Sequence, residues 1–201
     1  KILSGACPLD EGTIELFGKP FSPRTPHHSR RAGIAMIYQE LSLAVHLSVE
    51  ENILLGVEPR RGLLMDRANF RSLALEVMQH VGLEDMAPST RVAELSIAER
   101  QLVEIARSVA AGCDLLVLDE PTSSLTGEDV PRLFKLIREW RSRGKGIVYI
   151  SHFLEEVKEI SDSYTVLRDG RVVDRGATCE VGVSQIVTRM VGRKIEDMYC
   201  K

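Results

Sequence analysis

An apolar stretch that ends in two acids and a proline constrains this chain more than any other feature of its 201 residues. Residues 115–118 read Leu-Leu-Val-Leu, which predicts a buried strand, and Asp119, Glu120 and Pro121 follow directly. In open parallel sheets, ligands bind at the carboxyl ends of the strands, so both carboxylates are expected at a binding edge. Because proline disfavours helical backbone in the residue before it, Glu120 is expected to stay extended and to project from the strand tip.

Two carboxylates at such a place suit a hydrated magnesium ion and an attacking water molecule. Asp119 is expected to hold Mg²⁺, which prefers one or two carboxylates together with phosphate oxygens. Glu120 is then the residue that orients or deprotonates the water. The alternative is a strand that ends in a solvated acidic turn, and this segment by itself leaves both interpretations open.

Strand and helix patterns alternate around this segment, which predicts an α/β fold with a parallel sheet. The predicted strands cover residues 13–17, 33–38, 115–118 and 146–150, and the last is expected to be buried. Apolar residues at helical spacing predict helices over about 102–109, 130–140 and 185–191. The Asp169-Gly170 pair between apolar runs predicts a β-hairpin.

Residues from about 41 to 100 contain no comparable strand pattern. Five apolar residues there fall at helical spacing before Gly82, namely Phe70, Leu73, Ala74, Val77 and Val81. We expect an inserted helical lobe over residues 41–100, and a core formed by residues 1–40 and 101–201.

Composition narrows the class of protein. With a net charge of −3, the chain offers no concentrated basic face for nucleic acid. The cysteines have no metal-site spacing and are expected to be free thiols in a reducing cytoplasm: Cys7, Cys113, Cys179 and Cys200. Since no apolar run approaches the ~20 residues that span a bilayer, any membrane contact is expected to go through a protein partner.

Three further polar residues have both a structural and a chemical explanation. Gln39 and His152 each follow a predicted strand, where a polar residue is often only structural. Ser96 precedes a predicted helix and is a good helix cap. The same exposed N–H groups and positive helix end that favour a cap also suit a phosphate.

Taken in order, these elements resemble the ATP-binding cassette family, over essentially the whole chain. The strand that ends in Asp119-Glu120 resembles the Walker B strand, and Gln39 resembles the Q-loop glutamine. Residues 95–101, Leu-Ser-Ile-Ala-Glu-Arg-Gln, resemble the ABC signature, and residues 123–126 occupy the place of the D-loop. His152 occupies the place of the switch histidine. The resemblance implies a P-loop NTPase core with a parallel sheet, in which the lobe is an α-helical signature subdomain.

The resemblance also implies a role for each matched residue. Glu120 and His152 would be catalytic, and Gln39 and Asp119 would hold Mg²⁺. Contact with ATP is implied for Gln39, Ser96, Ala98, Glu99 and Asp119. In the family two cassettes pair head-to-tail, so the signature residues would serve the ATP held by a second cassette.

The chain departs from the family pattern at the signature, the D-loop and the phosphate loop. Ala98 and Glu99 stand where the family commonly has glycine and glutamine, so an added methyl group and a negative charge are expected to weaken phosphate contact. Thr126 replaces the D-loop aspartate. The phosphate loop, Gly-x-x-x-x-Gly-Lys-Ser/Thr, does not occur in the sequence. Because residues 1–5 read as a helix end stopped by glycine, we expect truncation and an inactive chain in isolation.

Three segments point to one branch of the family. Residues 38–43 and 46–53 resemble the region after the Q-loop in ribose, galactose and xylose import ATPases, and residues 190–199 resemble the junction between their two cassettes. The implied partners are a second cassette, a membrane sugar permease and, indirectly, a sugar-binding protein, with no nucleic acid. The implied location is peripheral, at the cytoplasmic face of the inner membrane. The alternatives are an ABC ATPase of a non-transport class and a non-catalytic nucleotide-binding module.

Overall fold

The computed structural model describes residues 1–62 and 64–191, which form two compact units. The first unit spans residues 1–150, and the second begins at Ser151. The lobe predicted over residues 41–100 falls within the first unit, and its boundaries stay a prediction.

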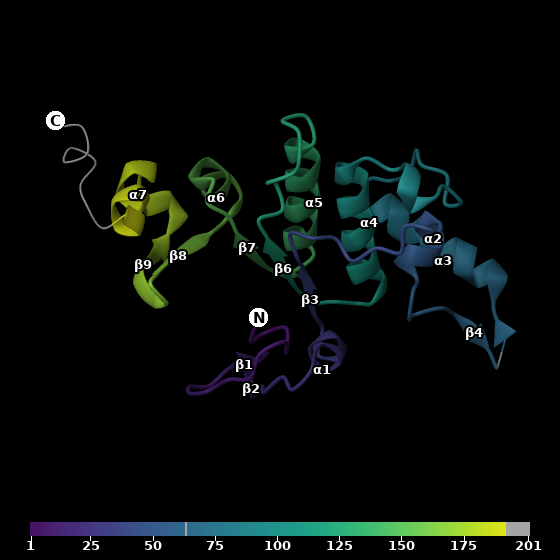
Figure 1. The fold of residues 1–201 in the computed structure, drawn as a ribbon, viewed down its shortest axis with the longest axis horizontal. Coiled ribbons are helices and arrows are strands. Elements are labelled where there is room, and N and C mark those ends of the chain that lie inside the picture. Colours follow the sequence, from purple (N-terminus) through teal and green to yellow (C-terminus); the bar gives the residue numbers. More distant parts are fainter. Residues whose placement is uncertain (63, 192–201) are drawn as a thin grey trace. The chain divides into compact units, whose positions relative to one another are not determined.

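A parallel three-stranded sheet forms the centre of the first unit (Figure 1). Strand β6 (Leu115–Asp119) lies between β3 (Ile34–Ile37) and β7 (Gly146–Ile150). Ile37 pairs with Leu118 and Asp119 pairs with Ile150, so the three strands end at the same edge. The parallel sheet predicted from the alternation of strands and helices is confirmed.

The prediction of a fully buried strand at residues 146–150 was wrong. Exposed and half-buried side chains alternate along β7, and Val148 and Ile150 are 39% and 43% exposed. An edge position does not by itself explain this exposure, because β3 is also an edge strand of this sheet and its side chains are mostly buried. An apolar run specifies a strand, but its burial depends on which elements cover it.

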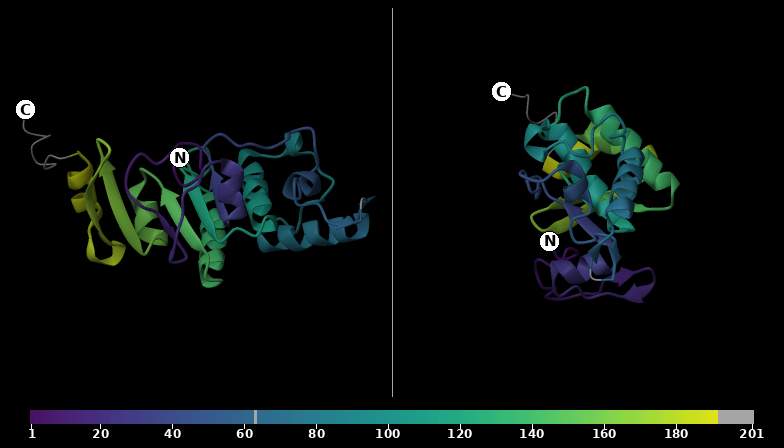
Figure 2. Two further views of the ribbon diagram at one scale, coloured as in Figure 1. Left: turned by 90° about the horizontal axis from the view of Figure 1, so that it is seen from below. Right: turned by 90° about the vertical axis from the view of Figure 1, so that its right-hand side faces the viewer.

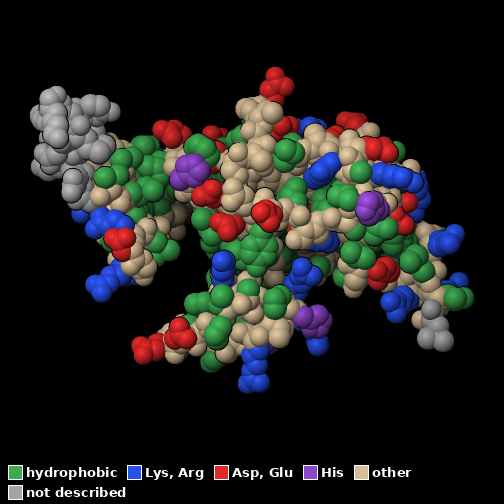
Figure 3. Space-filling model, in the orientation of Figure 1, with side chains coloured by type: hydrophobic (Ala, Val, Ile, Leu, Met, Phe, Trp, Pro, Cys, Tyr) green, Lys and Arg blue, Asp and Glu red, His purple; other side chains and the backbone are tan. Residues whose placement is uncertain are grey.

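Two amphipathic helices accompany the sheet. Helix α4 (Ile97–Ala110) contacts β3, and α5 (Val130–Ser142) contacts β7. Their buried apolar residues include Leu102, Val103, Ile105, Leu133, Phe134, Ile137 and Trp140. On the face that Figure 3 shows, acidic and basic side chains are interspersed.

The strand predicted at residues 13–17 is instead a short hairpin. Strands β1 (Glu15–Leu16) and β2 (Lys19–Pro20) pair antiparallel around Phe17 and Gly18, both with positive φ. Two consecutive residues with positive φ form a tight turn that suits a hairpin, and glycine adopts positive φ readily. Helix α1 (Pro26–Arg31) follows, capped by the Thr25 side chain.

The stretch between β3 and α4 is mainly helical, with α2 (Val49–Ile53), α3 (Arg67–His80) and a short 3-10 helix, η1 (Val92–Glu94). The helix predicted from Phe70 to Val81 is therefore confirmed. A short antiparallel pair also occurs here, β4 (Arg60–Arg61) with β5 (Leu64–Met65). These two-residue strands were not predicted, because they are too short to produce a periodic pattern in the sequence.

The second unit contains α6 (Leu154–Ile160), η2 (Thr178–Glu180), a hairpin and a helix, α7 (Val183–Val191). The hairpin joins β8 (Ser163–Arg168) to β9 (Arg171–Ala177) through Asp169 and Gly170, both with positive φ, as predicted. Figure 2 shows α7 beside this hairpin, where Ile186 packs with Leu154 and Val166. Of the tail that resembles a cassette junction, residues 192–199 lie outside the described residues.

The chain begins with a glycine-stopped helical turn, as predicted. The N–H of Gly5 donates to the carbonyl of Ile2 at 2.9 Å, and that of Ala6 to Lys1 at 3.1 Å. With Gly5 at φ 70°, these bonds form the Schellman motif that ends helices.

Three of the four cysteines are free thiols in the structure, and Cys200 lies outside the described residues. Cys7 and Cys179 are exposed, whereas burial raises the pKa of the Cys113 thiol to about 12. Within the described residues, no helix is both long enough and apolar enough to cross a bilayer.

Candidate functional site

The carboxyl edge of the sheet collects three of the predicted site residues. Asp119 is the last residue of β6, Glu120 follows it, and both are half-buried. Gln39 lies two residues beyond β3 and is exposed. Ile37 of β3 is paired with Leu118 of the adjacent strand β6. Gln39, Asp119 and Glu120 therefore follow these paired residues at the same end of the two strands. Gln39, Asp119 and Glu120 therefore lie at one edge of the sheet.

The backbone at Glu120 differs from the prediction. Glu120 has φ 48°, in the left-handed region, rather than the extended conformation expected before Pro121. Proline disfavours the right-handed helical conformation in the residue before it, which leaves the extended and the left-handed conformations. Glu120 adopts the left-handed one. Hydrogen bonds explain the choice, because the Glu120 N–H donates to the Ile150 carbonyl at 2.9 Å. Its own carbonyl accepts from the N–H and hydroxyl of Ser123, at 3.2 and 2.9 Å.

His152 belongs to the second unit, just before α6. Its side chain is exposed, and its ring centroid lies 4.2 Å from that of Phe153. The N–H of Phe153 donates to the Ser151 hydroxyl, which donates to Glu156. The role of His152 beside the carboxylates of the first unit stays a prediction.

Ser96 caps α4 through a reciprocal pair of hydrogen bonds with Glu99. The Ser96 hydroxyl accepts from the Glu99 N–H at 3.3 Å, and the Glu99 carboxylate accepts from the Ser96 N–H and hydroxyl at 2.8 and 2.9 Å. This is a capping box, which satisfies donors that a helix N-terminus otherwise leaves free. The carboxylate of Glu99 thus already accepts from the N–H and hydroxyl of Ser96, and the contact of these residues with a phosphate stays a prediction.

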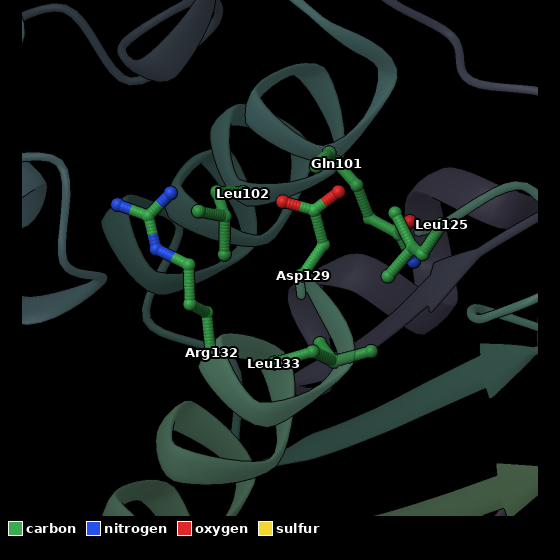
Figure 4. A pocket seen from close by; sticks show the side chains of 7 residues that line it. Gln101, Leu102, Leu125, Asp129, Arg132 and Leu133 are labelled. Atoms are coloured by element: carbon green, nitrogen blue, oxygen red, sulfur yellow. The ribbon is translucent and has the colours of Figure 1, made fainter. Parts of the chain in front are cut away.

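A shallow pocket lies beside this helix end, between α4 and the start of α5 (Figure 4). It is lined by Ala98, Gln101, Leu102, Leu125, Asp129, Arg132 and Leu133. The signature residue Ala98 and the D-loop residue Leu125 therefore share one pocket. Thr126, which replaces the D-loop aspartate, donates its hydroxyl to Asp129 at 2.5 Å. Sequence reasoning missed Asp129, whose only signal was an acid three residues after Thr126.

A second feature that sequence reasoning missed is an ion pair inside α4. Glu104 is 3% exposed and lies 2.8 Å from Arg107. Burial raises the pKa of the Glu104 carboxyl, whereas Arg107, the Ser42 N–H and Arg30 lower it. The sequence contained one signal, an acid among the apolar residues of a predicted helix face.

The oxygen atoms at the sheet edge fit a magnesium ion. Mg²⁺ prefers oxygen ligands and usually keeps waters, with one or two carboxylates and substrate phosphates completing its shell. Asp119 offers a carboxylate and Gln39 an amide oxygen. Among residues 1–62 and 64–191, no three His, Cys, Asp or Glu side chains form a metal cluster.

The fold and the sequence both match known cassette proteins. The structure of the ADP conformation of MJ1267, an ATP-binding cassette of an ABC transporter, superposes with a TM-score of 0.77 at 20% identity, over 98% of this chain and 80% of that one. CbiO1 of Clostridium perfringens, part of the ABC transporter complex cbiONQ, gives 0.77 at 22% identity, over 98% and 78%. The sequence profile of the ABC transporter family matches residues 1–123, and the chain belongs to that family.

Among its relatives are proteins named for sugar import. "Putative ribose/galactose/methyl galactoside import ATP-binding protein 1" of Agrobacterium fabrum is 47% identical over 199 residues, 99% of this chain and 39% of the relative. "Ribose import ATP-binding protein RbsA 1" of Rubrobacter xylanophilus is 44% identical over 99% of this chain and 40% of its own length. The chain therefore spans about two fifths of these relatives.

Proposed function

We propose that this chain is part of an ATP-binding and ATP-hydrolysing subunit that powers monosaccharide import through a membrane permease. The observation that carries the proposal is the convergence of Gln39, Asp119 and Glu120 at the carboxyl edge of a parallel sheet. Identity of 41–47% to sugar-import ATP-binding proteins, over nearly the whole chain, supports the same reading.

Each residue has a definite part in the proposed hydrolysis. Asp119 and Gln39 would hold Mg²⁺, and the ion would supply positive charge that neutralises charge on the nucleotide. Glu120 accepts a proton from the water that attacks the γ-phosphate, while the bond from that phosphorus to the bridging oxygen breaks and ADP leaves. His152 is assigned a catalytic role from its match to the switch histidine of the family. Glu120 and His152 are thus the proposed catalytic residues.

The signature residues serve a second ATP molecule, held by another cassette. Ser96, Ala98 and Glu99 stand at the N-terminal end of α4, where free N–H groups and the helix dipole favour an anion. Because Glu99 holds Ser96 in a capping box, phosphate contact requires that this carboxylate move aside. Two cassettes that close on ATP then bind the permease at the cytoplasmic face of the inner membrane, as a peripheral ATPase.

Substitution of Glu120 by glutamine tests the proposal. In the full-length protein, with its permease in vesicles, Glu120→Gln should still bind ATP. It should hydrolyse ATP about a hundredfold more slowly, the usual scale for a general base. Sugar uptake should fall with hydrolysis, because the amide cannot accept the proton.

Glu128→Gln is the matched control, because Glu128 is an exposed acid beyond the D-loop. Normal turnover by the Glu120 variant would remove Glu120 from the chemistry. ATP hydrolysis without any sugar uptake in the wild-type protein would favour an ABC ATPase of a non-transport class.

A further inference from the structure

The buried carboxylate of Glu104 contacts a distant stretch of backbone. Its Oε2 atom accepts a hydrogen bond from the N–H of Ser42 at 3.0 Å, 62 positions away in sequence. Its other oxygen accepts from Arg107 at 2.8 Å. A carboxylate buried among apolar residues needs such partners, since an unpaired charge there is very unfavourable.

Arg107 completes the contact. Its second terminal nitrogen donates to the carbonyl oxygen of Ser42 at 2.8 Å. The ion pair therefore binds both backbone polar groups of a single residue, and the guanidinium fork suits two such bonds at once. We call this arrangement of Glu104, Arg107 and Ser42 the Ser42 clamp.

The rest of the same segment is also bound. Asn52 of α2 is fully buried, accepts from the Ala44 N–H at 2.8 Å, and donates to the Ala44 carbonyl at 3.0 Å. The carbonyls of Val45 and Leu47 accept from the backbone of residues 93 and 92, at 3.0 and 3.1 Å. The guanidinium of Arg100, on α4, donates in turn to the carbonyls of residues 93 and 92, at 2.9 and 3.1 Å. Both ends of residues 42–47 are thereby connected to α4.

The hydrogen bonds between residues 42–47 and α4 connect the neighbourhood of Gln39 to the helix that begins after Ser96. Residues 41–44 are neither helix nor strand, so nothing in their own conformation would hold them to a helix. Ser42 follows Gln39 by three residues. Glu104 follows Ser96 by eight residues on one helix, which is a rise of about 12 Å. A helix transmits displacement along its axis as a rigid rod, whereas an unbound loop does not.

We propose that Glu104 and Arg107 are positioning residues that make residues 42–47 move as one body with α4. The segment beside Gln39 and the Ser96 end of the helix then change position together. The role in sugar import rests on the proposed function, but the rigid connection does not.

Distances between two spin labels test the rigid connection directly. The labels replace His46 on the segment and Ala111 just after α4, both exposed, in a full-length protein whose reactive cysteines are serine. The wild-type distance distribution should be narrow. Glu104→Gln and Arg107→Gln should each broaden it by about twofold or more, because the segment gains local freedom.

Two further variants keep this test decisive. Arg71 of α3 lies 3.3 Å from Glu50 of α2 and forms an ion pair with it. Arg71→Gln removes this ion pair and should leave the width of the distance distribution unchanged. The double substitution Glu104→Leu with Arg107→Met restores apolar packing without the clamp, and should broaden the distribution even if a single variant folds poorly. A wild-type width in the double variant would overturn the proposal.

Coupling in vesicles tests the consequence. With its permease, the Glu104→Gln protein should keep its KM for ATP, and hydrolyse ATP within about twofold of wild type. Sugar transported per ATP should fall about fivefold or more, the lower range of allosteric coupling. Equal losses of hydrolysis and transport with an unchanged label width would indicate only a structural role, and overturn the proposal. If the wild-type protein does not transport sugar, the proposed function fails, while the label distances still decide the clamp.

Discussion

Glu120 combines a chemical group with an unfavourable backbone conformation. A residue that carries a Cβ atom at φ 48° is in the left-handed region, where that atom crowds the following carbonyl. Three hydrogen bonds, to Ile150 and Ser123, hold the backbone there. Such conformations occur where the surrounding structure over-determines them, often at functional sites.

The strain can be measured by comparing two substitutions at Glu120. Alanine keeps the Cβ atom and glycine removes it, so Glu120→Gly should be more stable than Glu120→Ala by about 1 kcal/mol. At an ordinary position glycine is the less stable of the two, so the sign of the difference is diagnostic. Equilibrium urea unfolding measures it, and an alanine variant that is equally stable would show that the backbone is not strained.

At the scale of elements, the same cap appears at two helices. The Ser48 N–H and hydroxyl donate to Glu51 at 2.8 Å in both cases, and the Glu51 N–H donates back at 3.3 Å. The bonds donated by the N–H and the hydroxyl of Ser48 lower the pKa of the Glu51 carboxyl. The cap of α4 by Ser96 and Glu99 has nearly the same lengths. The geometry at the signature is therefore what a structural cap requires, and a role in phosphate binding must be tested separately.

The two caps provide a matched pair for that test. Ser48→Ala and Ser96→Ala should each destabilise the protein by about 1 kcal/mol, the usual value for a lost N-cap. Only Ser96→Ala should also reduce ATP hydrolysis in the full-length protein, because only that serine is proposed to meet a phosphate. Thermal unfolding and turnover should be measured on both variants. Equal turnover in the two would leave Ser96 with a structural role alone.

At the scale of the whole molecule, one apolar segment is fixed in place and yet partly exposed. Residues 42–47 are bound by backbone and side-chain hydrogen bonds, as described above, and Val45 is 38% exposed. A rigid segment that presents an apolar side chain loses little conformational entropy when it binds a partner. The proposed permease is expected to dock on residues 39–56, beside Gln39.

Crosslinking tests this docking surface. A cysteine at Val45 should crosslink to the cytoplasmic loops of the permease, and the yield should change with ATP. Lys135→Cys on α5 is a control, since that side chain is 80% exposed and belongs to another part of the unit. If no cysteine placed along residues 41–56 crosslinks while transport stays intact, the partner docks elsewhere.

Local patterns in the sequence were sufficient for much of the fold. The apolar run before Asp119 predicted β6, and Ser96 before a helical pattern predicted a capped helix. Asp169-Gly170 predicted the hairpin turn. Each of these features depends on residues a few positions apart, so the information is present in a short window of sequence.

Other features depend on residues far apart in the chain, and only the tertiary structure decided them. The hydrogen bond from the Glu120 N–H to Ile150, on a neighbouring strand, helps to hold Glu120 in the left-handed region, so the proline rule by itself predicted the wrong conformation. Likewise, the sequence does not indicate the Ser42 clamp, because Glu104 accepts a hydrogen bond from a residue 62 positions away. The sequence by itself determined where several of the longer strands and helices lie, such as β6 and α4, and which residue types carry the chemistry. Strand order and long-range hydrogen bonds decided how those residues are held, because neither is encoded in a local pattern.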